Sequence, residues 1–471
     1  QYDGTTNAAG SDLSSFDALQ GGETLTLSGS GSAVNDNVAN GISVSSLGTL
    51  ALVNGTGLAS NYSLNSAAIN ITQRVLNSSG SKTYDANTNA LAADITLSNL
   101  VSGETLNHSG TASVSSANAA SYTITNLAGI TLADNAGLAS NYTLTGGTHN
   151  FTVNPKVISL SGSRLYDATT DAVASDLTTI SGLVGSETLN LSGTGSVTNA
   201  NVASNKTVTL GTLALADNSG LAANYTLSGG THQLTINQRP LAATVARQYD
   251  GTKTAAGSDL SSFDALQGGE TLTLSGSGTV GDENVANGQG ITLGTLALVD
   301  GTGLASNYSL NSASLNITER VLNSSGSKTY DANTNALAGA ITLSNLVSGE
   351  ALNHSGTATI SSANAGSYTI TNLAGITIAD GSGGTASNYT LTGGTHNFTV
   401  NRRVVGVSGT RLYDATTNAV ASDLSTHTNL VGTETLNLSG TGTIASKNVG
   451  SNKTVSVGTL ALADGSNGGL A

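Results

Sequence analysis

Hydrophobic and polar residues alternate with period two in short runs along this chain. Phe151 and Val153 alternate with polar neighbours in HNFTV, and Leu213 and Leu215 do so in GTLAL. Gly, Asn, Asp and Ser bound these runs, and such residues supply turn geometry. No stretch of the chain carries the apolar stripe of an amphipathic helix. The segment AAGSDLSSFDAL could hold one short helical turn. The pattern predicts short β-strands joined by turns.

The runs belong to a repeat, because the dipeptide Tyr-Asp recurs six times at spacings of 81 to 83 residues. Its tyrosines are Tyr2, Tyr84, Tyr166, Tyr249, Tyr330 and Tyr413. A Glu-Thr-Leu or Glu-Ala-Leu step follows in each copy, at Glu23, Glu104, Glu187, Glu270, Glu350 and Glu434. An Asn-Tyr pair closes five copies, with its tyrosine at Tyr62, Tyr142, Tyr225, Tyr308 and Tyr389. Self-similarity at a fixed period is the signature of a repeat architecture.

We predict six modules, in which near-identical copies return after 246 or 247 residues, so that their order is A-B-C-A-B-C. The predicted ranges are 1–73 (A, first strand missing), 74–155 (B), 156–238 (C), 239–319 (A), 320–401 (B) and 402–471 (C, last strands missing). The first copy begins directly at Tyr-Asp, and the last stops where the others continue into Asn-Tyr. We therefore expect the chain to be a piece of a longer array.

Six to seven short strands in about 82 residues suit a small β-sandwich. A β-grasp-like module with one short helix has the same strand content. A continuous β-solenoid is the alternative, but its rungs should repeat about every 20–25 residues. The prediction is an all-β, linear tandem array of six sandwich-like or β-grasp-like modules.

Composition excludes several classes of function. The chain has 15 Lys and Arg against 29 Asp and Glu, a net charge of −14, and no basic block, so we expect no nucleic-acid partner and no binding to an anionic membrane surface. The absence of cysteine excludes disulfides, thiol catalysis and Cys-ligated metals. No apolar run approaches the ~18 residues of a membrane helix, and the residues from Gln1 onward do not have the basic, apolar pattern of a signal segment.

No catalytic, cofactor-binding or metal site is predicted. The six histidines are scattered, and the Gly-rich strings lie between strands as turns. Calcium is the alternative considered, because residues 34–41 (VNDNVANG) and 281–288 (GDENVANG) are rich in oxygen ligands. Neither has an ordered ligand spacing, and the C modules lose the carboxylates at the equivalent positions. We therefore expect a non-enzyme.

The tyrosines occupy equivalent positions in the copies, so we predict that they form the core rather than a sugar-binding platform. The Asp of Tyr-Asp precedes Gly or Ala and is expected to cap a turn. A base lies two residues before five of the six tyrosines, at Lys82, Arg164, Arg247, Lys328 and Arg411. A cross-turn ion pair is expected. An isopeptide cross-link is excluded wherever the base is Arg, which cannot supply the amine.

The module YD(G/A)T…GGETLTLSGSG…NVA…LGTLAL…ASNYTL…NIT resembles the YDG-type repeats, related to MBG modules, of large bacterial haemagglutinin-like adhesins. The resemblance covers the whole chain. It implies an exoprotein of the filamentous-haemagglutinin type, exported by two-partner secretion through an outer-membrane transporter. We therefore expect an extracellular stalk at the bacterial cell surface, whose adhesin contacts other cells, matrix polysaccharide or copies of itself. The alternative function is a homotypic matrix filament.

Overall fold

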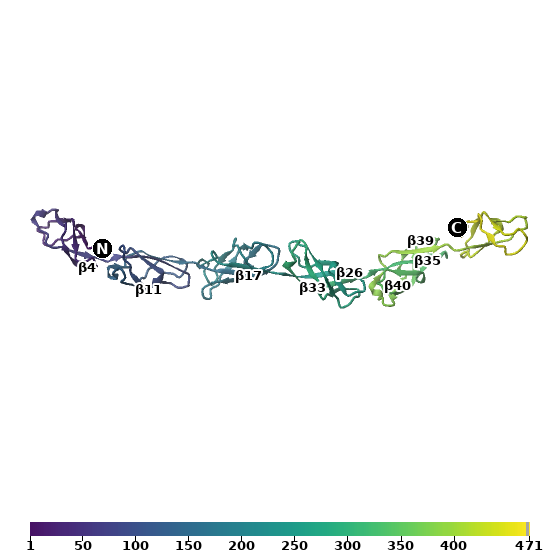
Figure 1. Cartoon of the computed structure of the whole chain (residues 1–471), viewed down its shortest axis with the longest axis horizontal. Coiled ribbons are helices and arrows are strands. Elements are labelled where there is room, and N and C mark those ends of the chain that lie inside the picture. The colour runs from purple at the N-terminus through teal and green to yellow at the C-terminus, as the bar shows by residue number, and fades with distance from the viewer. Residues whose placement is uncertain (468–470) are drawn as a thin grey trace. The chain divides into compact units, whose positions relative to one another are not determined.

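The computed structural model describes residues 1–467 and 471, and within them the chain forms 49 β-strands and 11 single-turn 3-10 helices. Each strand has 11 residues or fewer, as in β33 (Tyr308–Thr318). The strands gather into separate small groups along the chain (Figure 1). The prediction of an all-β chain is confirmed.

Module 3 illustrates the topology. Its main sheet has the order β19-β17-β25-β22, formed by β17 (Ser159–Leu165), β19 (Thr179–Ser181), β22 (Ala203–Thr207) and β25 (His232–Asn237). Two further pairs cover it, β18 (Asp171–Val173) with β21 (Thr194–Ser196) and β20 (Asn190–Ser192) with β23 (Ala214–Ala216). The short strands β16 (Lys156–Val157) and β24 (Tyr225–Thr226) pair in parallel at the start of the module. Single-turn helices η5 (Ala174–Asp176) and η6 (Ala222–Asn224) complete it.

A compact apolar core lies between the main sheet and the smaller pairs. Leu160, Leu234 and Ile236 of the main sheet are at most 1% exposed, and Ala172 opposite them is fully buried. Alternate residues of β25 point inward, as the pattern of period two predicts. Module 3 therefore buries an apolar core between its strands and has the sandwich-like architecture that the sequence predicts.

The main sheet recurs in modules 2, 4 and 5. Its strands are β8 (Asn77–Thr83), β10 (Ile95–Ser98), β12 (Ala120–Thr123) and β15 (His149–Asn154) in module 2; β26 (Arg239–Gln248), β28 (Leu260–Phe263), β31 (Ala286–Gly290) and β33 in module 4; and β35 (Asn323–Thr329), β37 (Ile341–Ser344), β39 (Gly366–Asn372) and β42 (His396–Asn401) in module 5. Module 1 keeps two strands of this sheet, β4 (Ala39–Ser46) and β6 (Ala68–Ile71), and β4 also pairs with β3 (Ser30–Ala33), which pairs with β1 (Asn7–Ala9). In module 5, β38 (Leu352–Ile360) pairs with β39 and joins the two layers into one curled sheet. In module 6 the described strands form smaller sheets, including β43 (Gly406–Ser408) with β45 (Thr426–Thr428).

Within each of two compact units, residues 1–237 and 238–471, every strand pair joins strands of one module. That arrangement differs from the continuous stacking of a β-solenoid, so the alternative fold is wrong.

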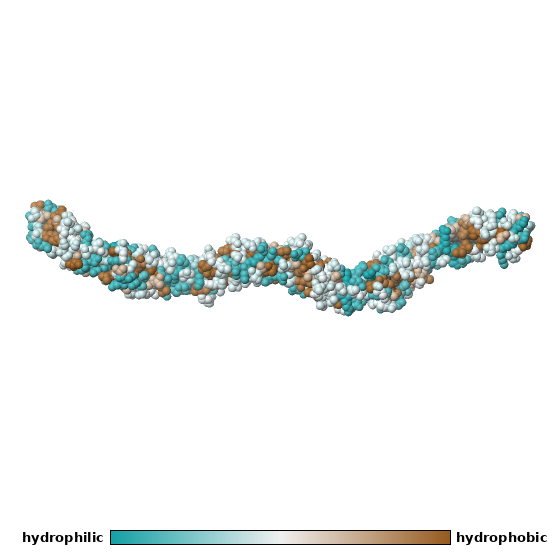
Figure 2. All heavy atoms as spheres, in the orientation of Figure 1, coloured by the Kyte–Doolittle hydropathy of each residue, from teal (hydrophilic) through white to brown (hydrophobic). Residues whose placement is uncertain are grey.

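No helix among the described residues is long and apolar enough to cross a membrane. On the face drawn in Figure 2, hydrophobic residues form small groups separated by polar surface.

Candidate functional site

The first and last long strands of a module are parallel neighbours, and this pairing determines where Tyr-Asp lies. In module 2, β8 pairs with β15 in parallel, and the N–H of Tyr84 continues the ladder by donating to the carbonyl of Asn154 at 2.9 Å. The chain then enters module 3 at Lys156 without a flexible linker. Tyr-Asp of one module is therefore held beside the start of the next module.

The Asn-Tyr pair of the following module reaches the same place. In module 3, β24 starts at Tyr225 and pairs in parallel with β16, the first strand of that module. Modules 2 and 5 repeat this pairing between β7 (Arg74–Val75) and β14 (Tyr142–Thr143), and between β34 (Arg320–Val321) and β41 (Tyr389–Thr390). The two tyrosines that recur in the sequence thus meet at the junction between modules.

One glutamate binds both tyrosines. At the junction of modules 2 and 3, Glu187 accepts a hydrogen bond from the Tyr84 hydroxyl at 2.6 Å and another from the Tyr225 hydroxyl at 2.5 Å. Each phenol donates to a different oxygen of the carboxylate, so both oxygens of Glu187 accept a hydrogen bond. The hydroxyl of Tyr225 also accepts the backbone N–H of Val184 at 3.0 Å.

The same contacts form at the junctions of modules 1 and 2 and of modules 4 and 5. Glu104 accepts from Tyr2 and, at 2.6 Å, from Tyr142. Glu350 accepts from Tyr249 and Tyr389, both at 2.6 Å. We call this arrangement, of a Tyr-Asp tyrosine with the Glu and Asn-Tyr tyrosine of the next module, the tyrosine clamp.

The two rings of each clamp pack edge to face. The ring centroids of Tyr84 and Tyr225 are 5.4 Å apart with an interplanar angle of 77°, the T-shaped geometry that aromatic pairs favour. The pairs Tyr2–Tyr142 and Tyr249–Tyr389 have centroid distances of 5.4 and 5.5 Å. The clamp therefore combines apolar burial with charge-assisted hydrogen bonds.

Burial and the carboxylate together favour the neutral phenol. Burial, and then the hydrogen bond to Glu187, raise the pKa of Tyr225 to about 12. Burial and the hydrogen bond to Glu350 likewise raise the pKa of Tyr389 to about 12. Ionisation would place a phenolate against a carboxylate in a buried site, which both causes disfavour.

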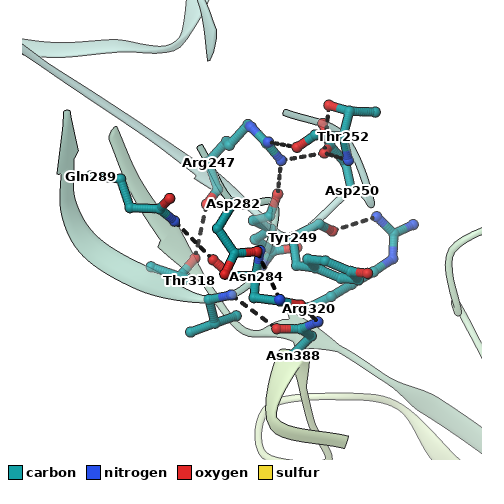
Figure 3. Close-up of polar contacts among 12 residues, drawn as sticks. Arg247, Tyr249, Asp250, Thr252, Asp282, Asn284, Gln289, Thr318, Arg320 and Asn388 are labelled. Atoms are coloured by element: carbon teal, nitrogen blue, oxygen red, sulfur yellow. Dashed lines mark hydrogen bonds and ion pairs between the residues drawn. The ribbon is translucent and has the colours of Figure 1, made fainter. Parts of the chain in front are cut away.

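An asparagine beside each clamp holds the preceding module through its backbone. At the junction of modules 4 and 5, Asn388 accepts the N–H of Val285 at 2.9 Å and donates to the side-chain oxygen of Asn284 at 2.7 Å (Figure 3). Arg320 adds a hydrogen bond to the carbonyl of Tyr249 at 3.3 Å. Equivalent asparagine contacts are made by Asn141 with Val38 and Asn37, and by Asn224 with Ala119 and Asn118.

The Asn-Tyr pair of module 1, the first of the six, is less buried than the equivalent pairs of modules 2, 3 and 5. Tyr62 donates to Glu23 at 2.7 Å within the module, but its ring is only half-buried and Asn61 is exposed. Asn141, Asn224 and Asn388, by contrast, are at most 1% exposed. The preceding module therefore supplies the burial of this pair.

At the junction of modules 5 and 6, Tyr330 donates to Glu434, and Arg403 donates to the carbonyl of Tyr330 at 3.3 Å. The hydrogen bond, followed by burial, raises the pKa of Tyr330 to about 12. The sequence of module 6 contains no Asn-Tyr pair, and a cavity of about 460 Å³ lies beside Tyr330 and Glu434. The Tyr–Glu half of the clamp thus forms by itself.

The Asp of Tyr-Asp caps a tight turn, as predicted. Asp167 accepts the backbone N–H and the hydroxyl of Thr169, both at 2.9 Å, and the residue between them, Ala168, has a φ of 63°. Gly251 adopts a φ of 73° at the equivalent place. Burial alone raises the pKa of Asp167, but the contacts with Thr169 and Arg164 outweigh it, so the pKa lies below its usual range.

The predicted ion pair between this Asp and the base three residues before it is confirmed in the five modules that have the base. Its members are Lys82–Asp85, Arg164–Asp167, Arg247–Asp250, Lys328–Asp331 and Arg411–Asp414. The basic side chains are well covered, with Lys82 and Arg247 each 8% exposed. Figure 3 shows the pair of Arg247 and Asp250 with Thr252 beside it.

Three histidines at one repeat position make hydrogen bonds within their own modules. His149 is 5% exposed and donates its Nε2 proton to the carbonyl of Leu144 at 2.7 Å, while its Nδ1 lies 2.9 Å from the hydroxyl of Ser78. His232 and His396 repeat this position. Among the described residues, no group of three or more His, Asp or Glu side chains is placed to hold a metal ion.

The predicted tyrosine core is confirmed in part and needs one correction. Eight of the tyrosines are 5% exposed or less: Tyr2, Tyr84, Tyr142, Tyr166, Tyr225, Tyr249, Tyr308 and Tyr389. Six of them, however, form the three clamps and bury one another across a module boundary rather than inside one module. Tyr413 is 58% exposed, and Tyr122 and Tyr368 are half-buried on their sheets, so these three are not core residues.

Comparison with protein families shows that the chain belongs to the YDG domain family. The family's YDG domain matches six times, at residues 1–70, 69–150, 148–233, 231–315, 314–396 and 399–469. The predicted six-fold tandem repeat is thereby confirmed. Comparison with curated proteins found no match. Among solved structures, the chain is similar at 7% identity to Drosophila N-cadherin EC1-4, covering 85% of this chain and 96% of that one with a TM-score of 0.13.

Proposed function

We propose that this chain is a non-enzymatic, extracellular repeat stalk of a bacterial surface or biofilm adhesin, which extends a binding region away from the cell. The observation that carries the proposal is the tyrosine clamp. The tyrosines and glutamate that recur in the repeat join one module to the next. A spacer needs such joints, because only neighbouring repeats touch in a tandem array. An enzyme would need a pocket of reactive groups instead.

The resemblance to haemagglutinin-like adhesins supports the cellular setting of the proposal. In this proposal the protein lies at the bacterial cell surface, after export by two-partner secretion through an outer-membrane transporter. The net charge of −14 with no basic block supports the same setting, since it offers no footprint for nucleic acid or anionic lipid. The adhesin of which this stalk forms part would contact other cells or matrix polysaccharide.

Small-angle scattering of the purified chain tests the stalk. A compact protein of 471 residues has a radius of gyration of about 23 Å. A stalk should give a radius several times larger that does not change with concentration. A radius close to the compact value would contradict the proposal.

The second candidate is a homotypic matrix filament in which the repeats themselves bind neighbouring chains or exopolysaccharide. The sheets favour considering it, because they end in edge strands such as β19 and β22 of module 3, and unpaired strand edges are templates for pairing with another chain. Analytical ultracentrifugation separates the two candidates. Association that rises with concentration would support the filament, whereas a monomer at all concentrations would support the stalk.

A further inference from the structure

Modules 2 and 5 carry a lysine where modules 3, 4 and 6 carry an arginine, and a second position changes with it. Lys82 and Lys328 have an asparagine five residues later, Asn87 and Asn333. The three arginines have a threonine at the same distance: Thr169, Thr252 and Thr416. A primary amine and a carboxamide thus occur together in the B modules and are absent together from the others.

The amine and the carboxamide are in contact. Nζ of Lys82 lies 2.8 Å from Oδ1 of Asn87 and 2.8 Å from Oδ1 of Asp85. The lysine side chain is 8% exposed. The folded turn therefore holds the amine against the amide through a hydrogen bond to its oxygen, and holding two reacting groups side by side favours an intramolecular reaction.

The carboxamide of Asn87 is polarised from two sides. Its Oδ1 accepts the backbone N–H of Asn89 at 2.9 Å as well as the Lys82 amine. Its Nδ2, which would be the leaving group, donates to Oδ2 of Asp85 at 2.7 Å. Donors on a carbonyl oxygen stabilise the charge that develops there in a tetrahedral intermediate. Asp85 bridges the attacking and the leaving nitrogen, as a general acid–base must.

Module 5 repeats the arrangement. Nζ of Lys328 lies 2.9 Å from Oδ1 of Asn333 and 2.7 Å from Oδ1 of Asp331. The backbone N–H of Asn335 donates to Oδ1 of Asn333 at 2.9 Å. The lysine is 12% exposed, so two independent copies place the same groups together.

We propose that Lys82 and Asn87, and likewise Lys328 and Asn333, form intramolecular isopeptide bonds, with Asp85 and Asp331 as proton carriers. The carboxylate takes a proton from the lysine ammonium, and the free amine attacks Cγ of the asparagine. The tetrahedral intermediate collapses with cleavage of the Cγ–Nδ2 bond. The aspartate returns its proton to the departing nitrogen, so that ammonia leaves, takes up the second lysine proton in water and becomes ammonium. No electron is transferred and no cofactor is needed.

Such a bond would close the turn that carries the Tyr-Asp tyrosine. Lys82 is the penultimate residue of β8, and Asn87 lies just before β9 (Asn89–Leu91). Tyr84, between them, donates to Glu187 in the next module. The bond would therefore brace the turn beside the tyrosine clamp of modules 2 and 3, and beside the contact of Tyr330 with Glu434 in modules 5 and 6.

Mass spectrometry of the full chain after digestion with trypsin under denaturing conditions tests the proposal. We expect no cleavage after Lys82 or Lys328, and peptides spanning them that are each lighter by one ammonia. The mass of the intact chain is insufficient alone, because cyclisation of Gln1 also releases ammonia. Cleavage after both lysines, with peptides of unaltered mass, would overturn the proposal. Ammonia loss at Asn87 with cleavage retained after Lys82 would indicate a succinimide and would overturn it as well.

Two variants of module 2 assign the roles, and module 5 of the same molecule is the internal control. Asn87→Thr adopts the residue found in the Arg modules, so it should fold and should restore cleavage after Lys82 while Lys328 stays resistant. Asp85→Ala keeps the amine and the amide but removes the proton carrier, and it should also restore cleavage. A bond that forms as completely in Asp85→Ala as in the wild type would overturn the role of the aspartate.

Discussion

The hydroxyl of Tyr84 donates a hydrogen bond of 2.6 Å to the carboxylate of Glu187, a residue 103 positions further along the chain and in the next module. Glu187 accepts Tyr225 of its own module on its other oxygen. A single carboxylate thus joins two modules. Its removal leaves two phenols without their acceptor.

We expect Glu187→Ala to loosen the junction of modules 2 and 3. Hydrogen bonds to charged groups contribute about 1.5–3 kcal/mol each, so the opening free energy of the junction should fall by roughly 3 kcal/mol. Hydrogen exchange at Val184, whose amide donates to Tyr225, measures this change. Glu23→Ala is the matched control, since Glu23 accepts Tyr62 of its own module; its effect should be smaller and confined to module 1. Equal effects of the two variants would argue against a role at the junction.

Tyr142→Ala should cost roughly 3–5 kcal/mol, the usual penalty for truncating a buried aromatic residue. Tyr142 is 2% exposed and packs on Tyr2 of module 1, so the damage should extend across that junction as well as through module 2. Limited proteolysis should show new cleavage within residues 74–155 and at the end of module 1. Modules 4 to 6 should stay protected. Unchanged proteolysis together with lost adhesion would instead identify the tyrosine as a ligand contact.

Alkaline pH should open the clamps. The raised pKa of Tyr225 means that the folded state holds its phenolic proton more tightly than the unfolded state, where the pKa is about 10. The stability that this supplies is fully present below about pH 10 and is lost as the pH rises through about 12. Phenolate absorbance and exchange at Val184 should change together in this window. Tyr225→Phe should remove the part of the pH dependence that belongs to module 3.

Acid should weaken the Tyr-Asp turns. Because the pKa of Asp167 is lowered in the folded state, its contribution to stability is present above the unfolded value of about 3.9 and disappears as the pH falls through the folded value. A series of thermal melts below pH 5 should therefore show falling stability of module 3. Asp167→Asn should flatten that slope, whereas an unchanged slope would mean that other carboxylates cause it.

The repeat itself made much of the fold predictable. Period-two runs such as the one around Phe151 identify inward-facing strand positions, and Phe151 is fully buried in β15. The Asx turn and the ion pair at Asp85 follow from local sequence, since both involve residues no more than three positions apart. Contacts between residues close in sequence can be predicted in this chain, because the same residues recur from module to module.

The tyrosine clamp could not be predicted from the sequence alone. Tyr84 and Glu187 are separated by a whole module length, and only the parallel pairing of β8 with β15 shows that Tyr-Asp lies where the chain leaves the module. The available signal was that Tyr-Asp, Glu and Asn-Tyr recur together. Recurrence fitted a module core equally well, because a core and a junction both bury their aromatic residues.

If the tyrosine clamp fixes one module against the next, two spin labels placed on neighbouring modules should lie at a well-defined distance. The chain has no native cysteine, so one cysteine on an exposed strand position of module 2 and one of module 3 can be labelled without background. We expect a narrow distance distribution for the wild-type junction and a broad one for Glu187→Ala, with labels on modules 1 and 2 unaffected by that variant. Equally broad distributions with and without Glu187 would contradict it.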